Sequence, residues 1–266
     1  MTDAKAAPVS AFPALRFADG RQQWASDSVI AERAIALSYN GRVYAVMLAT
    51  PADLEDFAYG FSLSAGIIEH FDQLRVIEIL TQERGLVLEM LIPQARFDAC
   101  IGTTRRLPGT AGCGLCGSES LSAALSEPPR LGQRLRVDPQ TITRAITELG
   151  ERQVWNAISG GVHAAGHVGE QGLILREDIG RHNALDKLIG AIREAPEPRG
   201  FVLMSSRASY ELVHKAACAG IELLATVSAP SSLAIELAER VGLSLVAFVR
   251  EQRLSVYSHP GRLGMA

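Results

Sequence analysis

Two cysteines lie near the middle of the chain, in the run Gly112-Cys-Gly-Leu-Cys-Gly117, and their spacing suggests chemistry. Cysteines at this spacing form half of a zinc site when a second set of ligands accompanies them. They form a redox pair when they open a helix that directly follows a strand. They also act as sulfur nucleophiles or carriers when a thiolate is accessible on a loop. The residues themselves leave these uses open, although the flanking glycines do not suit a redox pair, and neither Cys100 nor Cys218 belongs to a matching second pair.

The segment around this pair, residues 102–118, contains five glycines and Pro108. Such a sequence cannot hold a helix or a strand at low cost in conformational entropy, so it predicts a mobile loop. A mobile loop would let a thiol swing between two partner molecules.

A second group of reactive residues forms the run from Glu177 to Lys187, in which eight of eleven positions are polar or glycine. The run follows a short predicted strand, and α/β proteins bind ligands at the carboxyl ends of strands. We therefore expect His182 and Asn183 to line a binding site. The simpler alternative is structural, with Asp178 capping a helix and Asp186 pairing with a cation.

Serine-rich turns follow the next two predicted strands, at residues 205–209 and 228–232. Because N–H groups at a helix start, hydroxyls and an arginine suit an anion, we expect Ser206, Arg207 and Ser231 to contact one ligand that spans both turns. Ordinary helix capping is the alternative. His163, which follows two glycines at a predicted strand end, is a further candidate.

The elements that must position these residues divide the chain into three parts. Residues 1–25 show no periodicity and are expected to form a flexible tail. Residues 26–130 predict an α+β domain that carries the cysteine loop, with Asn40-Gly41 as a hairpin turn and a helix that Thr50 caps. Residues 131–262 predict an α/β domain, because short apolar strands alternate with helices of about ten residues, which is typical of βαβ crossovers.

The composition excludes several classes of protein. Of the 266 residues, 47% are hydrophobic and 21% are charged, which is ordinary for a globular protein. The net charge of −3 comes without a densely basic segment and argues against a nucleic-acid partner. No apolar run approaches the length of a membrane span, and the N-terminus lacks the layout of a signal peptide, so we expect a cytoplasmic protein with no membrane partner.

Several separate motifs together resemble one known family, that of the formate dehydrogenase accessory sulfurtransferase FdhD. They are the Gly112–Gly117 run, the Glu177–Lys187 run, Ser206-Arg207 followed by Glu211-Leu-Val-His-Lys215, and Ala229-Pro-Ser-Ser-Leu-Ala234. The resemblance covers about residues 28–260, and the motifs occur in the family's order.

The resemblance implies a function, a fold and partners. Proteins of this family take persulfide sulfur from a cysteine desulfurase and pass it to the bis-molybdopterin guanine dinucleotide cofactor, which they bind as a substrate before it enters formate dehydrogenase. Cys113 would be the active cysteine and Cys116 the second thiol. The family's C-terminal half is similar to the cytidine deaminase core, an αβα three-layer domain, and its members are homodimers. Its cofactor-contacting stretch falls on Phe248, Val249, Arg250, Glu251, Gln252 and Arg253.

Two other functions compete with this one. A zinc deaminase needs a His-x-Glu motif followed by a cysteine pair, whereas here Ala165 stands where the glutamate should be and the cysteines come first. We therefore expect no metal. A thiol-based redox sensor or scaffold would need no cofactor site and would leave the polar strand ends unexplained.

Overall fold

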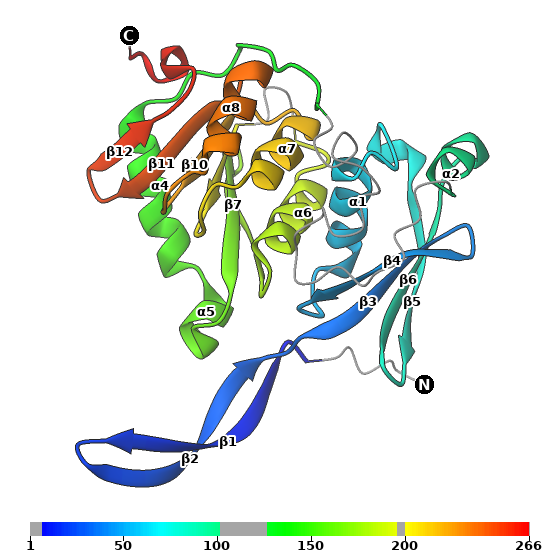
Figure 1. The fold of residues 1–266 in the computed structure, drawn as a ribbon, viewed down its shortest axis with the longest axis vertical. Helices are drawn as coiled ribbons and strands as arrows, with labels where there is room; N and C mark the ends of the chain where they lie inside the picture. Colours follow the sequence, from blue (N-terminus) through cyan, green and yellow to red (C-terminus); the bar gives the residue numbers. More distant parts are fainter. Residues whose placement is uncertain (1–6, 102–126, 196–199, 266) are drawn as a thin grey trace.

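The computed structural model describes residues 7–101, 127–195 and 200–265. It contains a long hairpin, an N-terminal unit with a four-stranded sheet, and a C-terminal unit with a six-stranded sheet (Figure 1). None of the described helices is long and apolar enough to cross a membrane.

The N-terminal unit is built on a sheet with the strand order β4-β3-β6-β5. As the sequence predicts, Asn40 and Gly41 join the first two strands, both with a positive φ (50° and 80°), as a tight hairpin turn requires. Helix α1 packs its apolar face on this sheet, and Phe57 and Phe61 are almost fully buried there. The elements of this unit are β3 (Arg33–Tyr39), β4 (Arg42–Ala49), α1 (Leu54–Ser64), the short 3-10 helix η1 (Phe71–Gln73), β5 (Arg75–Gln82), β6 (Gly85–Leu91) and α2 (Gln94–Ile101).

The C-terminal unit is a three-layer αβα structure with the strand order β12-β11-β10-β9-β7-β8. Strands β9, β10 and β11 are parallel, and β7 runs antiparallel to β9. Helices α6, α7 and α8 share one apolar core with one face of the sheet, and α4 shares another with the opposite face. The predicted α/β fold class is therefore confirmed.

The elements of the C-terminal unit follow the predicted alternation. They are α4 (Pro139–Glu151), α5 (Val154–Ser159), β7 (His163–Gly169), β8 (Gly172–Asp178), α6 (Arg181–Ala191), β9 (Phe201–Met204), α7 (Tyr210–Cys218), β10 (Leu223–Thr226), α8 (Ser232–Val241), β11 (Ser244–Arg250), β12 (Arg253–Val256) and the 3-10 helix η2 (Pro260–Leu263).

The two units meet where α1 lies against α6 (Figure 1). Gly60 on α1 and Gly190 on α6 allow the backbones to touch. A Cβ atom at Gly60 would overlap the Asp186 carbonyl group, and one at Gly190 would overlap that of Asp56. Glycine is needed at this crossing because any side chain would force the helices apart.

Two expectations about the N-terminal half are wrong. Thr50 does not cap α1. The N-cap is Asp53, whose backbone lies in the left-handed region (φ 51°) and whose side chain makes no capping hydrogen bond. Thr50 is instead fully buried against the C-terminal unit.

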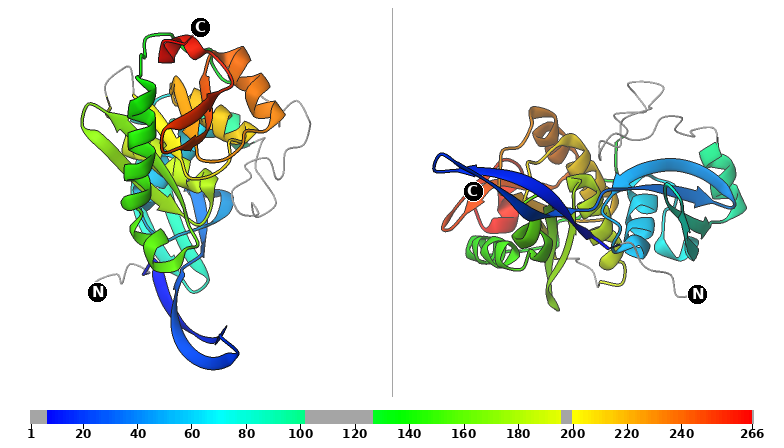
Figure 2. Two further views of the ribbon diagram at one scale, coloured as in Figure 1. Left: turned by 90° about the vertical axis from the view of Figure 1, so that its left-hand side faces the viewer. Right: turned by 90° about the horizontal axis from the view of Figure 1, so that it is seen from below.

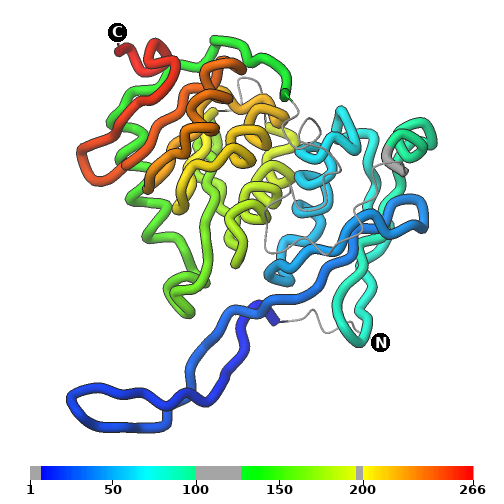
Figure 3. Tube along the Cα trace, in the orientation of Figure 1, coloured from blue at the N-terminus to red at the C-terminus, as the bar shows by residue number. Residues whose placement is uncertain are grey.

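The expected tail over residues 1–25 is wrong from Val9 onward, where β1 (Val9–Ala18) and β2 (Arg21–Ile30) form an antiparallel hairpin that projects from the body (Figures 1 and 3). The physical reason is the Asp19-Gly20 turn, in which both residues have a positive φ (50° and 73°), as a two-residue hairpin loop demands. The projection is also evident in the two turned views of Figure 2. We call this hairpin, residues 9–30, the arm.

Candidate functional site

The candidate site lies at the carboxyl ends of β9, β10 and β11. Because β7 is antiparallel to β9, its first residue, His163, lies at this same edge, opposite Asp178 at the end of β8. Ser205, the first residue after β9, is fastened to β7 by two hydrogen bonds. The Ala164 N–H donates to the Ser205 Oγ at 2.8 Å, and the Ser205 N–H donates to the Ala164 carbonyl at 3.0 Å.

The two serine-rich turns lie side by side, as the prediction of one shared ligand requires. Ala208 forms an isolated parallel bridge with Pro230, and the Ser231 N–H donates to the Ala208 carbonyl at 2.9 Å. The hydroxyls have local roles as well. Ser231 caps α8 by accepting from the Ala234 N–H, and the Ser206 hydroxyl donates to the Arg207 carbonyl. The turns therefore offer a ligand mainly N–H groups and the exposed Arg207 side chain.

Two histidines and two arginines share the part of this edge between β7, α6 and the turn after β9. Burial lowers the pKa of His163, and the charges of Arg181 and Arg207 lower it further. Burial, followed by the charges of Arg181 and Lys215, lowers the pKa of His182 to about 2. Both imidazoles are consequently neutral near pH 7, while the two guanidinium groups carry the positive charge of the site.

His182 has unused hydrogen-bonding capacity. Its side chain is 1% exposed, yet neither ring nitrogen has a hydrogen-bond partner among the residues that the structure describes. In the same part of the chain, Arg181 Nε, Asn183 Oδ1 and Ser209 Oγ are also buried without a partner. Leaving such groups unpaired costs about 1–3 kcal/mol each, so they fit a site that a polar ligand completes. Sequence reasoning did not single out Arg181 or the Ser209 hydroxyl, although both lie in the runs from which the other candidates came.

The stretch Phe248–Arg253 lies at the same end of the sheet but divides between two faces. A bulge between Ala247 and Arg250 places Phe248 in the left-handed region (φ 54°), a position that glycine usually takes, and turns its ring outward to 40% exposure. The ring lies beside Tyr257, which packs on the core of α6–α8. Val249 is buried.

The turn after β11 borders a different surface. Glu251, Gln252 and Arg253 line an open groove of about 920 Å³ whose other wall is α4, on the opposite face of the sheet. The described residues of this groove include both acidic and basic side chains, such as Glu148 and Arg144. The stretch does not form a single surface with the serine turns.

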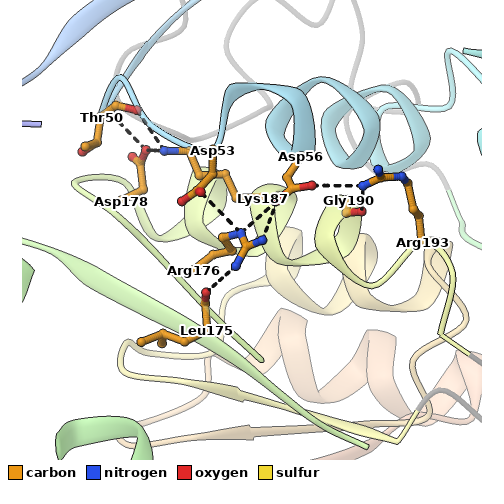
Figure 4. A network of polar contacts seen from close by, with 9 residues as sticks. All are labelled: Thr50, Asp53, Asp56, Leu175, Arg176, Asp178, Lys187, Gly190 and Arg193. Atoms are coloured by element: carbon orange, nitrogen blue, oxygen red, sulfur yellow. Dashed lines mark hydrogen bonds and ion pairs between the residues drawn. The ribbon is translucent and has the colours of Figure 1, made fainter. Parts of the chain in front are cut away.

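Most of the remaining charged residues of the Glu177–Lys187 run serve structure. The simpler alternative is right that Asp186 pairs with a cation, Lys215, but wrong that Asp178 caps a helix, because the N-cap of α6 is Gly180. Lys187 is completely buried, with its Nζ 2.6 Å from Asp178 Oδ2 and 2.9 Å from the Thr50 carbonyl (Figure 4). Asp178 also accepts from the Thr50 N–H, and Asn183 donates its amide to the Leu48 carbonyl. These bonds fasten the N-terminal unit to α6.

Two further ion-pair groups cross the same junction. Lys215 on α7 contacts Asp186 on α6 at 2.8 Å and Ser64 on α1 at 2.9 Å. Asp56 on α1 pairs with Arg176 and with Arg193 (Figure 4). The orientation of the site relative to the N-terminal unit is therefore fixed by buried and half-buried charge pairs.

Of Cys113, Cys116 and Cys218, the structure describes only Cys218. Cys113 and Cys116 lie outside the described residues. Cys218 lies on α7 with its Sγ 3.7 Å from His214 Nδ1, and burial raises its pKa to about 11. A thiol with so high a pKa is almost entirely protonated at neutral pH and is a poor nucleophile, as expected for an inert thiol. The described residues contain no group of three or more His, Cys, Asp or Glu side chains that could hold a metal ion.

Comparison with known proteins identifies the family. The model of the FdhD/NarQ family matches residues 30–264. This chain belongs to the FdhD/NarQ family. The family resemblance inferred from the motifs is confirmed.

Curated FdhD relatives match nearly the whole chain. The sulfur carrier protein FdhD of Xanthomonas campestris pv. campestris (strain B100) is 49% identical over 254 residues, covering 94% of this chain and 90% of the relative. The sulfur carrier protein FdhD of Bordetella petrii is 45% identical over 242 residues, covering 90% and 87%. A crystal structure from Desulfotalea psychrophila, assigned as a formate dehydrogenase accessory protein, is 26% identical, with a TM-score of 0.77 over 97% of this chain and all of that chain.

Proposed function

We propose that this protein is a sulfur carrier that receives persulfide sulfur from a cysteine desulfurase and transfers it to bis-molybdopterin guanine dinucleotide before that cofactor enters formate dehydrogenase. The relatives named as sulfur carriers and the accessory-protein assignment of the similar structure support the general role. The observation that carries the proposal is the gathering of Arg181, Arg207 and the unpartnered His182 at one sheet edge.

Sulfur enters through Cys113. Its thiolate attacks the terminal sulfur of the desulfurase persulfide, the sulfur–sulfur bond of the donor breaks, and the desulfurase cysteine leaves as a thiolate. The product is a persulfide on Cys113, and no external oxidant or reductant is needed. The protein thus acts as a sulfurtransferase, as an accessory carrier more than as a multiple-turnover enzyme.

Cys116 supplies a way to release the sulfur. Attack of the Cys116 thiolate on the inner sulfur of the Cys113 persulfide would form a disulfide between the two residues and free the outer sulfur as sulfide. The two electrons that convert sulfane sulfur to sulfide come from the two cysteine thiols, so the step balances.

The sheet edge binds the guanine nucleotide part of the cofactor. Arg207 and Arg181 present permanently charged guanidinium groups that suit the pyrophosphate, and the turn N–H groups add neutral donors. His182, held neutral by burial, offers one donor and one acceptor to a polar group of the ligand. When bound, the cofactor supplies the molybdenum centre that receives the sulfur.

The first test separates the thiols. Cys113→Ala should abolish maturation of formate dehydrogenase, whereas the matched variant Cys218→Ala should leave it intact, because the Cys218 thiol is buried with a raised pKa. Full maturation with Cys113→Ala would refute the carrier assignment.

The second test addresses the nucleotide. Calorimetry should detect GDP binding, and Arg207→Ala should weaken it about tenfold or more, since hydrogen bonds to charged groups contribute about 1.5–3 kcal/mol. Arg152→Ala, which removes an exposed arginine at the end of α4, is the control and should leave the affinity unchanged. ADP should compete poorly. Equal binding of ADP and GDP would mean that the site recognises only phosphate, and binding of neither would leave the redox-sensor alternative.

A further inference from the structure

The two histidines of the candidate site differ in their access to solvent. His163 is the first residue of β7 and lies half-buried at the edge of the sheet, whereas His182 on α6 is 1% exposed. A proton can reach the His163 imidazole from water, while the imidazole of His182 is sealed inside the protein. His163 is therefore the histidine whose charge can change when a ligand binds at this edge.

The positive charges around His163 lack anionic partners. Arg181 begins α6, and Arg207 lies in the turn after β9. In the part of the chain that the structure describes, neither arginine belongs to an ion pair, and Arg181 Nε is buried without a hydrogen-bond partner. Lys215 on α7, by contrast, is already balanced by Asp186 at 2.8 Å. The two unbalanced guanidinium groups oppose a third cation at this edge as long as no anion is bound there.

The carboxylates on the neighbouring strand cannot stabilise a protonated His163 by a hydrogen bond. Asp178 lies opposite His163 in the pairing of β7 with β8. Its two oxygens accept from the Thr50 N–H, the Gly180 N–H, the Asn183 amide and the Lys187 Nζ. These donors fill the roughly four acceptor positions of a carboxylate. Glu177 points to the opposite face of the sheet, where it accepts from two N–H groups at the start of α5.

We propose that His163 takes up a proton when a diphosphate binds at this edge, so that its imidazolium becomes a third cation of the site and the affinity depends on pH. The inference rests on the proposed function, because it takes the diphosphate to lie against Arg181, Arg207 and the N–H groups of the serine-rich turns. The ligand then supplies the anion that the free site lacks. Phosphate oxygens only accept hydrogen bonds, and a protonated imidazole can donate from both ring nitrogens.

The direction of the pH dependence follows from the pKa of His163 in the two states. In the free protein burial, Arg181 and Arg207 hold this pKa below its ordinary value of 6.5. An opposite charge at about 4–6 Å moves a pKa by about 1–3 toward the charged form, so the ligand raises it. Between the two pKa values the complex holds a proton that the free protein does not. The affinity therefore increases by up to about tenfold for each pH unit as the pH falls through this interval, and is constant above it.

The test is calorimetric titration of the full chain with GDP-mannose in pairs of buffers that differ in their enthalpy of ionisation. Both phosphates of this probe are esterified, so neither takes up a proton near pH 6 as a terminal phosphate does. Phosphate buffer is avoided because it would compete for the site. The dependence of the binding heat on the buffer gives the number of protons taken up. We expect almost none at about pH 8.5 and an approach to one proton per ligand as the pH falls to about 6.

Substitutions assign the proton to a residue. His163→Gln keeps a polar side chain that cannot be protonated, so the uptake should disappear, and the wild type should bind about tenfold more tightly than this variant at about pH 6 but not at about pH 8.5. His70→Gln, which replaces an exposed histidine of the N-terminal unit, is the matched control and should retain the uptake. His182→Gln should retain it as well, because the buried imidazole stays neutral in both states.

The outcomes separate this inference from the proposed function. Binding by the wild-type protein without proton uptake would overturn the inference and leave the nucleotide site intact, and this result needs no variant to fold. Uptake that persists in His163→Gln, or that His182→Gln abolishes, would overturn it too, because another group would then hold the proton. Absence of binding at every pH would refute the nucleotide site of the proposed function and this inference with it.

Discussion

Replacing Lys187 with methionine should destabilise the protein strongly, because this residue neutralises a carboxylate that has no access to water. The Lys187 and Asp178 side chains are both 0% exposed, and the Lys187 Nζ lies 2.6 Å from Asp178 Oδ2. Methionine fills similar space, so the change removes a charge more than it removes packing. Breaking a buried pair by removing one partner costs about 3–5 kcal/mol.

The structure indicates that the loss of stability in Lys187→Met lies near the lower end of that range. Without the lysine, Asp178 would still accept from the N–H groups of Thr50 and Gly180 and from the Asn183 amide. These donors offset part of the cost of the unpaired charge, so we expect a loss of about 3 kcal/mol. For a chain of this size that corresponds to a fall in the melting temperature of roughly 6–12 °C.

The assay is urea unfolding followed by circular dichroism, with Arg152→Ala as the control. Arg152 pairs with Glu148 on the surface of α4, where the side chains are 48% and 52% exposed. An exposed pair of this kind contributes about 0.5 kcal/mol or less. A loss below about 1 kcal/mol for Lys187→Met, or a similar loss for both variants, would refute the argument that Lys187 neutralises a carboxylate without access to water.

Three further outcomes are expected. Gly60→Ala should cost about 1–3 kcal/mol because its Cβ would overlap the Asp186 carbonyl group, whereas Gly150→Ala, with open space around the added methyl group, should be neutral or stabilising in the same unfolding assay. His182 has a folded pKa of about 2, so below pH 6.5 the unfolded chain binds a proton that the folded chain does not, and stability falls as the pH falls. Between about pH 7 and pH 5 the His182→Gln variant should therefore lose about 2 kcal/mol less than the wild type, and equal losses would contradict the buried neutral imidazole. Elemental analysis of the purified protein should find well below one zinc per chain, and a full equivalent that resists mild chelation would revive the deaminase-like alternative.

Local sequence patterns predicted those parts of the fold that local forces determine. The Asn40-Gly41 turn and the crossovers from Phe201 to Arg250 follow from turn chemistry and apolar periodicity, and both occur in the structure. The arm has the same kind of signal in Asp19-Gly20. It was missed because its alternating apolar residues have no core within the chain to pack against, and the segment resembled a tail.

Contacts between distant residues could not be predicted in this way. Lys187 and Thr50 are 137 positions apart, and only the folded chain reveals that the polar run supplies buried charge pairs as well as site residues. The gathering of His163 with Arg181 and Arg207 was foreseeable in part, because parallel strands end at one edge of a sheet. The division of Phe248–Arg253 between two faces depends on a bulge at Phe248, for which the sequence offers no glycine as a signal.

The central claim is that Cys113 carries sulfur, and intact-protein mass spectrometry tests it most directly. The protein is incubated with a cysteine desulfurase and cysteine, and its mass is measured before and after treatment with a thiol reductant. We expect a gain equal to the mass of one sulfur atom that the reductant removes, that Cys218→Ala retains and that Cys113→Ala lacks. The absence of any gain in the wild-type protein, or an undiminished gain in Cys113→Ala, would contradict the account.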